Sequence, residues 1–234
     1  MEYNNTVSVC DGIRGEEMDH KELETYFQSL DRSFFVEGPL KECADLDEPL
    51  PIGFGQTISQ PSLVLEMTRI LSPEKESKVL EIGTGSGFQT ALLAKISAEV
   101  YTVEIIEQLM EKAKRRLEAL NFTNVYYRVG DGSEGWKEHA PYDRIMVTAA
   151  ALVLPDELIS QLAAGGRMVI PIGPSSLQEL KLITKTDDGD IDIKTVGSMA
   201  GYGNPANEGY NNSYPIHLPY TKQCRHSTII FFLV

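Results

Sequence analysis

Short apolar runs alternate with amphipathic stretches through the middle of this chain. The apolar runs predict strands over residues 78–82, 99–104, 124–129, 143–148 and 167–172. Helical spacing predicts helices over 88–96, 106–120 and 155–162, the last of which stops at Gly165-Gly166. Strands and helices that alternate through short loops predict an α/β fold with a doubly wound, mostly parallel sheet. Residues 177–186 and 191–196, joined by an Asp-Gly turn at 187–190, then predict a C-terminal antiparallel hairpin.

The segments on either side of this core have different patterns. Residues 1–60 are predicted to form an N-terminal helical segment, with one amphipathic face around Leu23 and Leu30, followed by a loop. The loop covers residues 48–55, which are too rich in proline and glycine for a regular element. Pro61 fits the first turn of a helix that ends before Ser72-Pro73. We expect one domain over 1–234, with a cofactor-binding core at 61–196 and a divergent tail at 197–234, whose last segment is either one more buried strand or an interface strand.

Composition narrows the possible partners. The 234 residues carry a formal net charge of -13, which disfavours nucleic-acid backbones as a partner. Cys10, Cys43 and Cys224 are widely spaced and form no CxxC pair, so neither a disulfide framework nor a thiolate zinc site is indicated. The N-terminus lacks the features of a signal peptide, and no run of about 18 apolar residues is present, so no membrane span is expected. These patterns predict a cytoplasmic protein that is a monomer, with the C-terminal segment as a surface through which copies could associate.

The most informative segment is the glycine-rich turn that follows the first core strand. Residues 79–87 read Val-Leu-Glu-Ile-Gly-Thr-Gly-Ser-Gly, so Glu81 precedes a G-x-G-x-G turn. Dinucleotide-binding turns instead space their glycines G-x-G-x-x-G and place a pyrophosphate at the helix N-terminus. A carboxylate at Glu81 would repel a pyrophosphate but suits a cofactor with a cationic amino-acid end. This segment therefore favours S-adenosylmethionine over NAD.

Two acidic residues follow the next two strands. Glu104 ends the second strand, 19 residues after Gly85, close to the spacing at which a carboxylate holds ribose hydroxyls. Asp131, between Gly130 and Gly132, follows the third strand and could accept the adenine amino group. Each residue alone has an ordinary explanation, as a strand end, a helix cap or a turn. Their occurrence after successive strands predicts a nucleotide-type cofactor.

Further motifs identify a family. They are Gly55-Gln56-Thr57-Ile58-Ser59-Gln60-Pro61, Leu80 through Ala91, Gly130-Asp131-Gly132, Pro141-Tyr142-Asp143, Val147 through Ala151, and Val169 through Gly173. Together these segments closely resemble protein-L-isoaspartate O-methyltransferases, which are class I methyltransferases with a Rossmann-like fold. The resemblance covers roughly residues 30–196, and the combination of motifs is highly specific.

The resemblance implies an activity. Such enzymes transfer a methyl group from S-adenosylmethionine, leaving S-adenosylhomocysteine, to the α-carboxylate of L-isoaspartyl residues in damaged proteins and peptides. The ester then collapses to a succinimide, which allows repair. The resemblance assigns an active role to Ser59, and substrate contact to Ser59, Thr148, Ala149 and Ala150. It assigns the cofactor to Thr57, Ile58, Glu81, Gly83, Thr84, Gly85, Ser86, Glu104, Asp131, Gly132 and Thr148.

The chemistry of methyl transfer agrees with the residue types. A carboxylate with a pKa of about 4 is already ionised at neutral pH, so the reaction requires alignment rather than a general base or a metal. No metal site is expected, because the four histidines show no ligand spacing. Ser59 has no histidine near it in sequence and is expected to position the substrate by hydrogen bonds, although it could also cap the helix that begins at Pro61.

After Val196 the chain departs from the family pattern, in a region that helps to shape the peptide groove. Two alternatives to repair therefore remain at this stage. One is a variant that methylates an ordinary aspartate in a dedicated peptide and so forms a succinimide deliberately. The other is a cofactor-binding homologue without repair activity.

Overall fold

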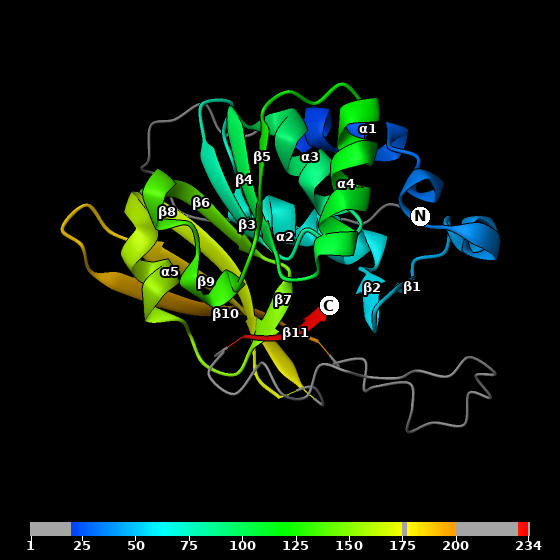
Figure 1. The fold of residues 1–234 in the computed structure, drawn as a ribbon. Coiled ribbons are helices and arrows are strands. Elements are labelled where there is room, and N and C mark those ends of the chain that lie inside the picture. Colours follow the sequence, from blue (N-terminus) through cyan, green and yellow to red (C-terminus); the bar gives the residue numbers. More distant parts are fainter. Residues whose placement is uncertain (1–19, 175–176, 200–228, 234) are drawn as a thin grey trace.

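The computed structural model describes residues 20–174, 177–199 and 229–233. Within these ranges a nine-stranded sheet forms the centre of the molecule, and a separate two-stranded hairpin lies beside it (Figure 1). The helices are α1 (His20–Ser29), α2 (Pro61–Leu71), α3 (Phe88–Ile96), α4 (Glu107–Ala119) and α5 (Asp156–Gln161). Four 3₁₀ turns are η1 (Arg32–Phe35), η2 (Gly38–Cys43), η3 (Gly132–Glu134) and η4 (Lys137–His139).

The strands follow the order expected for a doubly wound sheet. They are β1 (Leu50–Gly53), β2 (Gln56–Ile58), β3 (Lys78–Ile82), β4 (Glu99–Glu104), β5 (Val125–Val129), β6 (Tyr142–Val147), β7 (Ala149–Ala151), β8 (Leu162–Ile172), β9 (Gln178–Lys185), β10 (Ile191–Met199) and β11 (Ile229–Leu233). The main sheet runs β10-β9-β8-β6-β3-β4-β5. Its β8, β6, β3, β4 and β5 are parallel, while β9 and β10 are antiparallel. The predicted fold class is therefore confirmed.

The two faces of the sheet bury different helices. On one face α1 to α4 pack through a cluster that includes Leu71, Leu93 and Leu117. On the other face α5 packs through Leu158, against Ile145 and Met168 of the sheet. Strand order reverses between β3 and β6, because the chain runs from β3 towards β5 on one side and then returns to β6 on the other. Ligands of such sheets bind at this reversal, outside the carboxyl ends of the strands.

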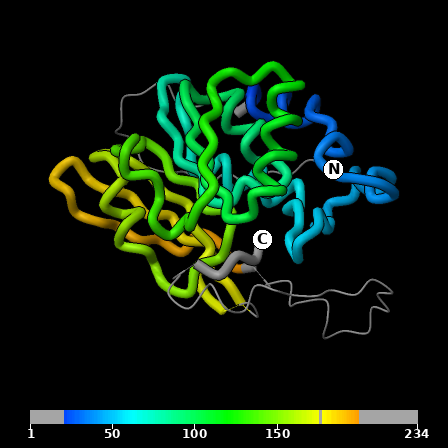
Figure 2. The backbone as a smooth tube through the Cα atoms, viewed as in Figure 1, coloured from blue at the N-terminus to red at the C-terminus, as the bar shows by residue number. Residues whose placement is uncertain are grey.

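The core elements begin and end close to the predicted residues. Strands β3 and β4 and helix α3 have the predicted bounds, because their apolar runs are bounded by glycine or polar residues. Helix α2 also begins at Pro61, and it ends where Ser72 adopts a left-handed conformation (φ 49°) ahead of Pro73. Figure 2 shows the N-terminal segment beside α3 and α4, at the opposite end of the molecule from the β9–β10 hairpin.

Four local predictions need correction or completion. The predicted loop at 48–55 contains strand β1, which pairs with β2 in an antiparallel hairpin. The helix predicted over 155–162 spans Asp156–Gln161, but Gly165 and Gly166 lie within β8, which begins at Leu162, rather than in a turn after the helix. The short strand β7 was not predicted. The final segment forms β11, which pairs with β7. Cys10, Cys224 and most of the tail, 200–228, lie outside the described residues.

Candidate active site

A pocket lies where the strand order of the sheet reverses, between the carboxyl ends of β3 and β6. Its walls come from the end of β2, the start of α2, the turn after β3, the first turn of α3 and the residue after β6. The lining residues are Thr57, Ile58, Ser59, Val64, Gly83, Thr84, Gly85, Ser86, Phe88, Gln89 and Thr148. Hydroxyl and amide groups are therefore abundant in this pocket, and none of the lining side chains titrates near neutral pH.

The glycine turn after β3 has a backbone that side chains rarely allow. Gly83, Gly85 and Gly87 have φ values of 97°, 54° and 89°. A Cβ on Gly87 would also lie 3.2 Å from the Cβ of Ala113, so a glycine there lets α3 approach α4 closely. The hydroxyl of Thr148 reaches the carbonyl oxygen of Gly83 at 2.6 Å. The turn is thus held from two neighbouring elements.

The carboxyl group of Glu104 also holds the glycine turn in place. Its Oε2 accepts a hydrogen bond from the backbone N–H of Gly85 at 2.9 Å, and its Oε1 accepts one from Ile106 at 3.0 Å. Only 2% of this residue is exposed. Burial raises the pKa of Glu104, against the lowering effect of the backbone N–H groups. Glu104 does not line the pocket itself but lies immediately behind the glycine turn.

Glu81 faces away from the pocket. It is fully buried on the sheet face that α3 covers, where its Oε2 accepts hydrogen bonds from Thr90 and Thr102. Burial, helped by the negative charge of Glu104 and opposed by the hydrogen bonds from Thr90 and Thr102, raises the pKa of Glu81 to about 8. The expectation that Glu81 presents a negative charge directly to a ligand does not match this geometry, because its neighbours are threonines rather than the pocket.

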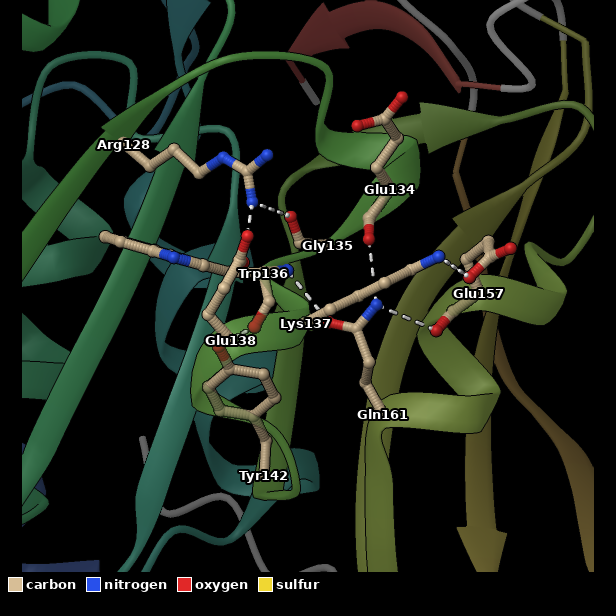
Figure 3. Close-up of polar contacts among 9 residues, drawn as sticks. All are labelled: Arg128, Glu134, Gly135, Trp136, Lys137, Glu138, Tyr142, Glu157 and Gln161. Atoms are coloured by element: carbon tan, nitrogen blue, oxygen red, sulfur yellow. Dashed lines mark hydrogen bonds and ion pairs between the residues drawn. The ribbon is translucent and has the colours of Figure 1, made fainter.

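Asp131 and Gly132 lie in the turn after β5. Asp131 accepts hydrogen bonds from the backbone N–H and the hydroxyl of Ser133, and so starts the 3₁₀ turn η3. The residues that follow are fixed by Gln161 of α5, which accepts from the N–H of Trp136 and donates to the carbonyl of Glu134 (Figure 3).

Two further contacts tie this loop to the sheet. Arg128 of β5 donates to the carbonyl oxygen of Gly135 (Figure 3). The hydroxyl of Tyr142 in β6 donates to the carbonyl oxygen of Trp136. Gly135 has a φ of 62°, and a Cβ there would lie 2.4 Å from Oε1 of Gln161. The loop that carries Asp131 is therefore rigidly placed beside the carboxyl end of the sheet.

The β1–β2 hairpin forms the wall of the pocket opposite the glycine turn, and Arg32 holds it there. The guanidinium of Arg32 is buried and donates to the carbonyl oxygens of Ala44, Leu46, Glu48 and Ser59 at 2.7–3.1 Å. One side chain thus ties together two segments, residues 44–48 and Ser59, which lie 12 to 27 residues from it in sequence. Sequence reasoning missed Arg32, because its partners are backbone carbonyls that carry no signal in the sequence.

The structure brings most of the predicted site residues together. Those that line the pocket are Thr57, Ile58, Ser59, Gly83, Thr84, Gly85, Ser86 and Thr148. Glu81, Glu104, Asp131 and Gly132 do not line it, and Ala149 and Ala150 are buried in β7. Ser59 does not cap α2, whose N-cap residue is Gln60. Gln89 was not predicted. Its side chain lines the pocket and donates to the hydroxyl of Thr68, and its place two residues after Gly87 is the signal that could have found it.

In the part of the chain that the structure describes, no group of three or more His, Cys, Asp or Glu residues is arranged to hold a metal ion. The same residues include no helix that is long and apolar enough to cross a membrane. Two of the four histidines, His217 and His226, lie outside the described residues.

Comparison with known proteins identifies the family. The family model for protein-L-isoaspartate(D-aspartate) O-methyltransferase (PCMT) matches residues 5–201. The chain belongs to this methyltransferase family. The resemblance predicted from the motifs is thereby confirmed.

Relatives in the family are similar over most of their length. The protein-L-isoaspartate O-methyltransferase of Dictyoglomus thermophilum is 48% identical over 176 residues, which cover 75% of this chain and 80% of the relative. The protein-L-isoaspartate O-methyltransferase of Pseudomonas aeruginosa is 52% identical over 159 residues, which cover 68% of this chain and 75% of the relative.

Solved structures of the same kind share the fold. One protein-L-isoaspartate O-methyltransferase matches with a TM-score of 0.65 at 31% identity, covering 80% of this chain and 62% of that one. A Plasmodium falciparum structure, solved in complex with S-adenosyl-L-homocysteine, also has a TM-score of 0.65, at 24% identity, and covers 78% of this chain and 91% of that one. The second match bears on the fold alone.

Proposed function

We propose that this chain transfers a methyl group from S-adenosylmethionine to the α-carboxylate of L-isoaspartyl residues in damaged proteins and peptides, which starts their repair. The observation that carries this proposal is the pocket at the strand reversal, which is rich in hydroxyl groups and has no titratable lining side chain. Family membership and the names of the relatives from D. thermophilum and P. aeruginosa support the choice of substrate.

The chemistry of the reaction fits such a pocket. An acceptor carboxylate with a pKa of about 4 is ionised at neutral pH, so no residue has to remove a proton. S-adenosylmethionine, when bound, supplies a methyl group on a positively charged sulfur. The remaining task of the protein is to align the acceptor and to exclude water. Hydroxyl groups can do this without titrating in the physiological range.

We assign the acceptor side of the pocket to the hairpin wall. The hydroxyl of Ser59 is the group best placed to donate to the acceptor carboxylate, since Arg32 fixes the backbone of this residue. Thr148 also lines the pocket, but its single hydroxyl hydrogen is directed at the carbonyl oxygens of Ile82 and Gly83. Thr148 therefore contributes to the substrate site by holding the glycine turn, while Ala149 and Ala150 belong to the buried strand β7 that directly follows Thr148.

We assign the cofactor to the glycine turn and the strand ends next to it. Each oxygen of Glu104 already accepts one backbone N–H, and a carboxylate oxygen can accept a second hydrogen bond from a ribose hydroxyl. Asp131 and Gly132 lie at the end of the next strand, where the adenine is expected. Thr57, Ile58, Thr84 and Ser86 complete the walls. The donors and acceptors present thus fit the nucleoside and the amino-acid end of S-adenosylmethionine.

A paired-peptide assay tests this function. Two peptides of the same sequence, one with an L-isoaspartyl and one with an aspartyl residue, are incubated with the full chain and S-adenosylmethionine labelled in the methyl group. We expect label in the isoaspartyl peptide alone. Label in the aspartyl peptide would instead identify a succinimide-forming variant. Cofactor binding without label in either peptide would identify a homologue that has lost the activity.

A further inference from the structure

A line of hydroxyl groups connects the pocket to the buried Glu81. Glu81 of β3 and Thr102 of β4 are directly paired across the sheet, and Oε2 of Glu81 lies 2.7 Å from the hydroxyl of Thr102. The hydroxyl of Thr102 in turn lies 2.6 Å from that of Thr84 in the glycine turn. Thr84 lines the pocket, while Thr102 and Glu81 are fully buried. The three residues therefore form one continuous path from the pocket wall into the core.

Counting hydrogens fixes the direction of this path. A hydroxyl group has a single hydrogen to donate. If Thr102 donates to an ionised Glu81, the contact with Thr84 requires Thr84 to donate to Thr102. The oxygen of Thr84 then has only lone pairs left for the pocket, and it can only accept hydrogen bonds there.

A proton on Glu81 changes this arrangement. Oε1 of Glu81 has no hydrogen-bond partner among the described residues, so a proton there would be a buried donor without an acceptor, which is unfavourable. A proton on Oε2 can donate to Thr102, whose own hydrogen then turns towards Thr84. The hydroxyl of Thr84 would in that case donate into the pocket.

The charges around Glu81 point to a cation supplied from outside the protein. Glu81 and Glu104 are exposed by 0% and 2%, and within the described residues neither forms an ion pair with Lys, Arg or His. Tyr127 of β5 lies in the same cross-strand row, next to Thr102, and its buried hydroxyl has no hydrogen-bond partner in the described part of the chain. Buried carboxyl groups are normally paired or neutral. Burial raises the pKa of Glu81 to about 8, which keeps it largely neutral until a positive charge arrives.

We propose that Glu81 is a positioning residue whose ionisation, passed through Thr102, turns Thr84 into an acceptor, so that binding of the cationic methyl donor releases the proton of Glu81. This inference rests on the proposed function only for the identity of the ligand. The product, S-adenosylhomocysteine, lacks the charge on sulfur and should release less of the proton. The relay would thus favour the donor over the product.

Calorimetric titration of the full chain tests the relay by binding alone. S-adenosylmethionine and S-adenosylhomocysteine are titrated at pH 6.5 in two buffers of different ionisation enthalpy, which gives the protons released per ligand. We expect close to one proton per donor in the wild type, a smaller fraction for the product, and none beyond the ligand's own titration in Glu81→Gln. Below the pKa of Glu81, the affinity for the donor should also increase by up to about tenfold for each unit by which the pH rises, since one proton is released on binding.

Two threonine variants separate the path from its surroundings. Thr102→Val removes the link to Thr84 and should reduce the preference for donor over product. Thr90→Val removes the other hydrogen bond to the same oxygen of Glu81 but leaves the path intact, so it should preserve most of that preference. Both variants remain informative if Glu81→Gln does not fold.

Equal proton release by wild type and Glu81→Gln would overturn the proposal, as would equal effects of the two threonine variants on donor preference. The failure of the relay and the failure of the proposed function can be told apart. Methyl transfer to an isoaspartyl peptide without proton release contradicts the relay alone, whereas proton-linked binding without methyl transfer contradicts the proposed function alone.

Discussion

Replacement of Arg32 by alanine should both destabilise the fold and impair the pocket. The guanidinium donates four hydrogen bonds to backbone carbonyls, at 2.9 Å to Ala44, 3.1 Å to Leu46, 2.7 Å to Glu48 and 3.1 Å to Ser59. Leu46 and Glu48 are exposed, so water can replace the arginine at their carbonyl groups. The loss is therefore concentrated at Ala44 and Ser59.

The magnitude follows from those two bonds. A hydrogen bond to a charged group contributes about 1.5–3 kcal/mol, and burial of the guanidinium, which lowers the pKa of Arg32, places its net contribution at the low end. Two such bonds give an expected loss of about 3 kcal/mol in the free energy of unfolding. Because Ser59 borders the pocket, its displacement should also lower kcat/KM for an isoaspartyl peptide by about 10- to 100-fold.

A surface arginine provides the matched control. Arg69 forms an ion pair with Glu24, and both side chains are at least one-third exposed, so Arg69→Ala should cost at most about 1 kcal/mol and leave kcat/KM unchanged. Urea unfolding and steady-state methyl transfer are measured for both variants. If Arg32→Ala matches Arg69→Ala in both measurements, the role assigned to Arg32 is wrong.

Three further predictions concern buried groups. Glu104→Gln removes a charged acceptor from behind the glycine turn and should weaken binding of S-adenosylhomocysteine by about tenfold or more, measured by calorimetry; unchanged affinity would argue against the ribose assignment. Gly135→Ala should destabilise the fold by about 1–3 kcal/mol more than Gly189→Ala in thermal unfolding, because both have positive φ but only the first places a Cβ against Gln161. Burial raises the pKa of Glu81 from 4.5 to about 8, so the folded state retains a proton that the unfolded chain loses. As the pH rises from about 5 to 8, the free energy of unfolding of the wild type should therefore fall relative to that of Glu81→Gln. Parallel pH dependences of the two proteins would contradict this.

The core elements could be predicted well from the sequence because strands and helices alternate regularly there. The apolar runs of β3 and β4 are bounded by polar residues or glycine, so their ends were clear. The β1–β2 hairpin was missed, since Pro51, Gly53 and Gly55 are typical of loops, and Arg32 holds the hairpin from a distant part of the chain. Secondary-structure propensity reflects only residues that are close in sequence, so it contains no information about a contact between Arg32 and this hairpin.

The same distinction applies to the site. The motifs placed Thr84, Ser86 and Thr148 around one pocket, because strand ends of a parallel sheet share one edge, whereas Thr57 and Ser59 were assigned only through the family resemblance. The orientation of Glu81 was a different question. Alternation along β3 places Val79 and Glu81 on one face and Leu80 and Ile82 on the other, but only the packing of α3 shows which face is which.

The central claim is that the methyl donor binds at the strand reversal, between the glycine turn and the β1–β2 hairpin. A crystal structure of the full chain with S-adenosylhomocysteine tests it most directly. We expect the amino-acid end beside Thr84, the ribose hydroxyls at Glu104 and the adenine near Asp131. Density for the ligand elsewhere, with this pocket empty at saturating concentration, would contradict the account.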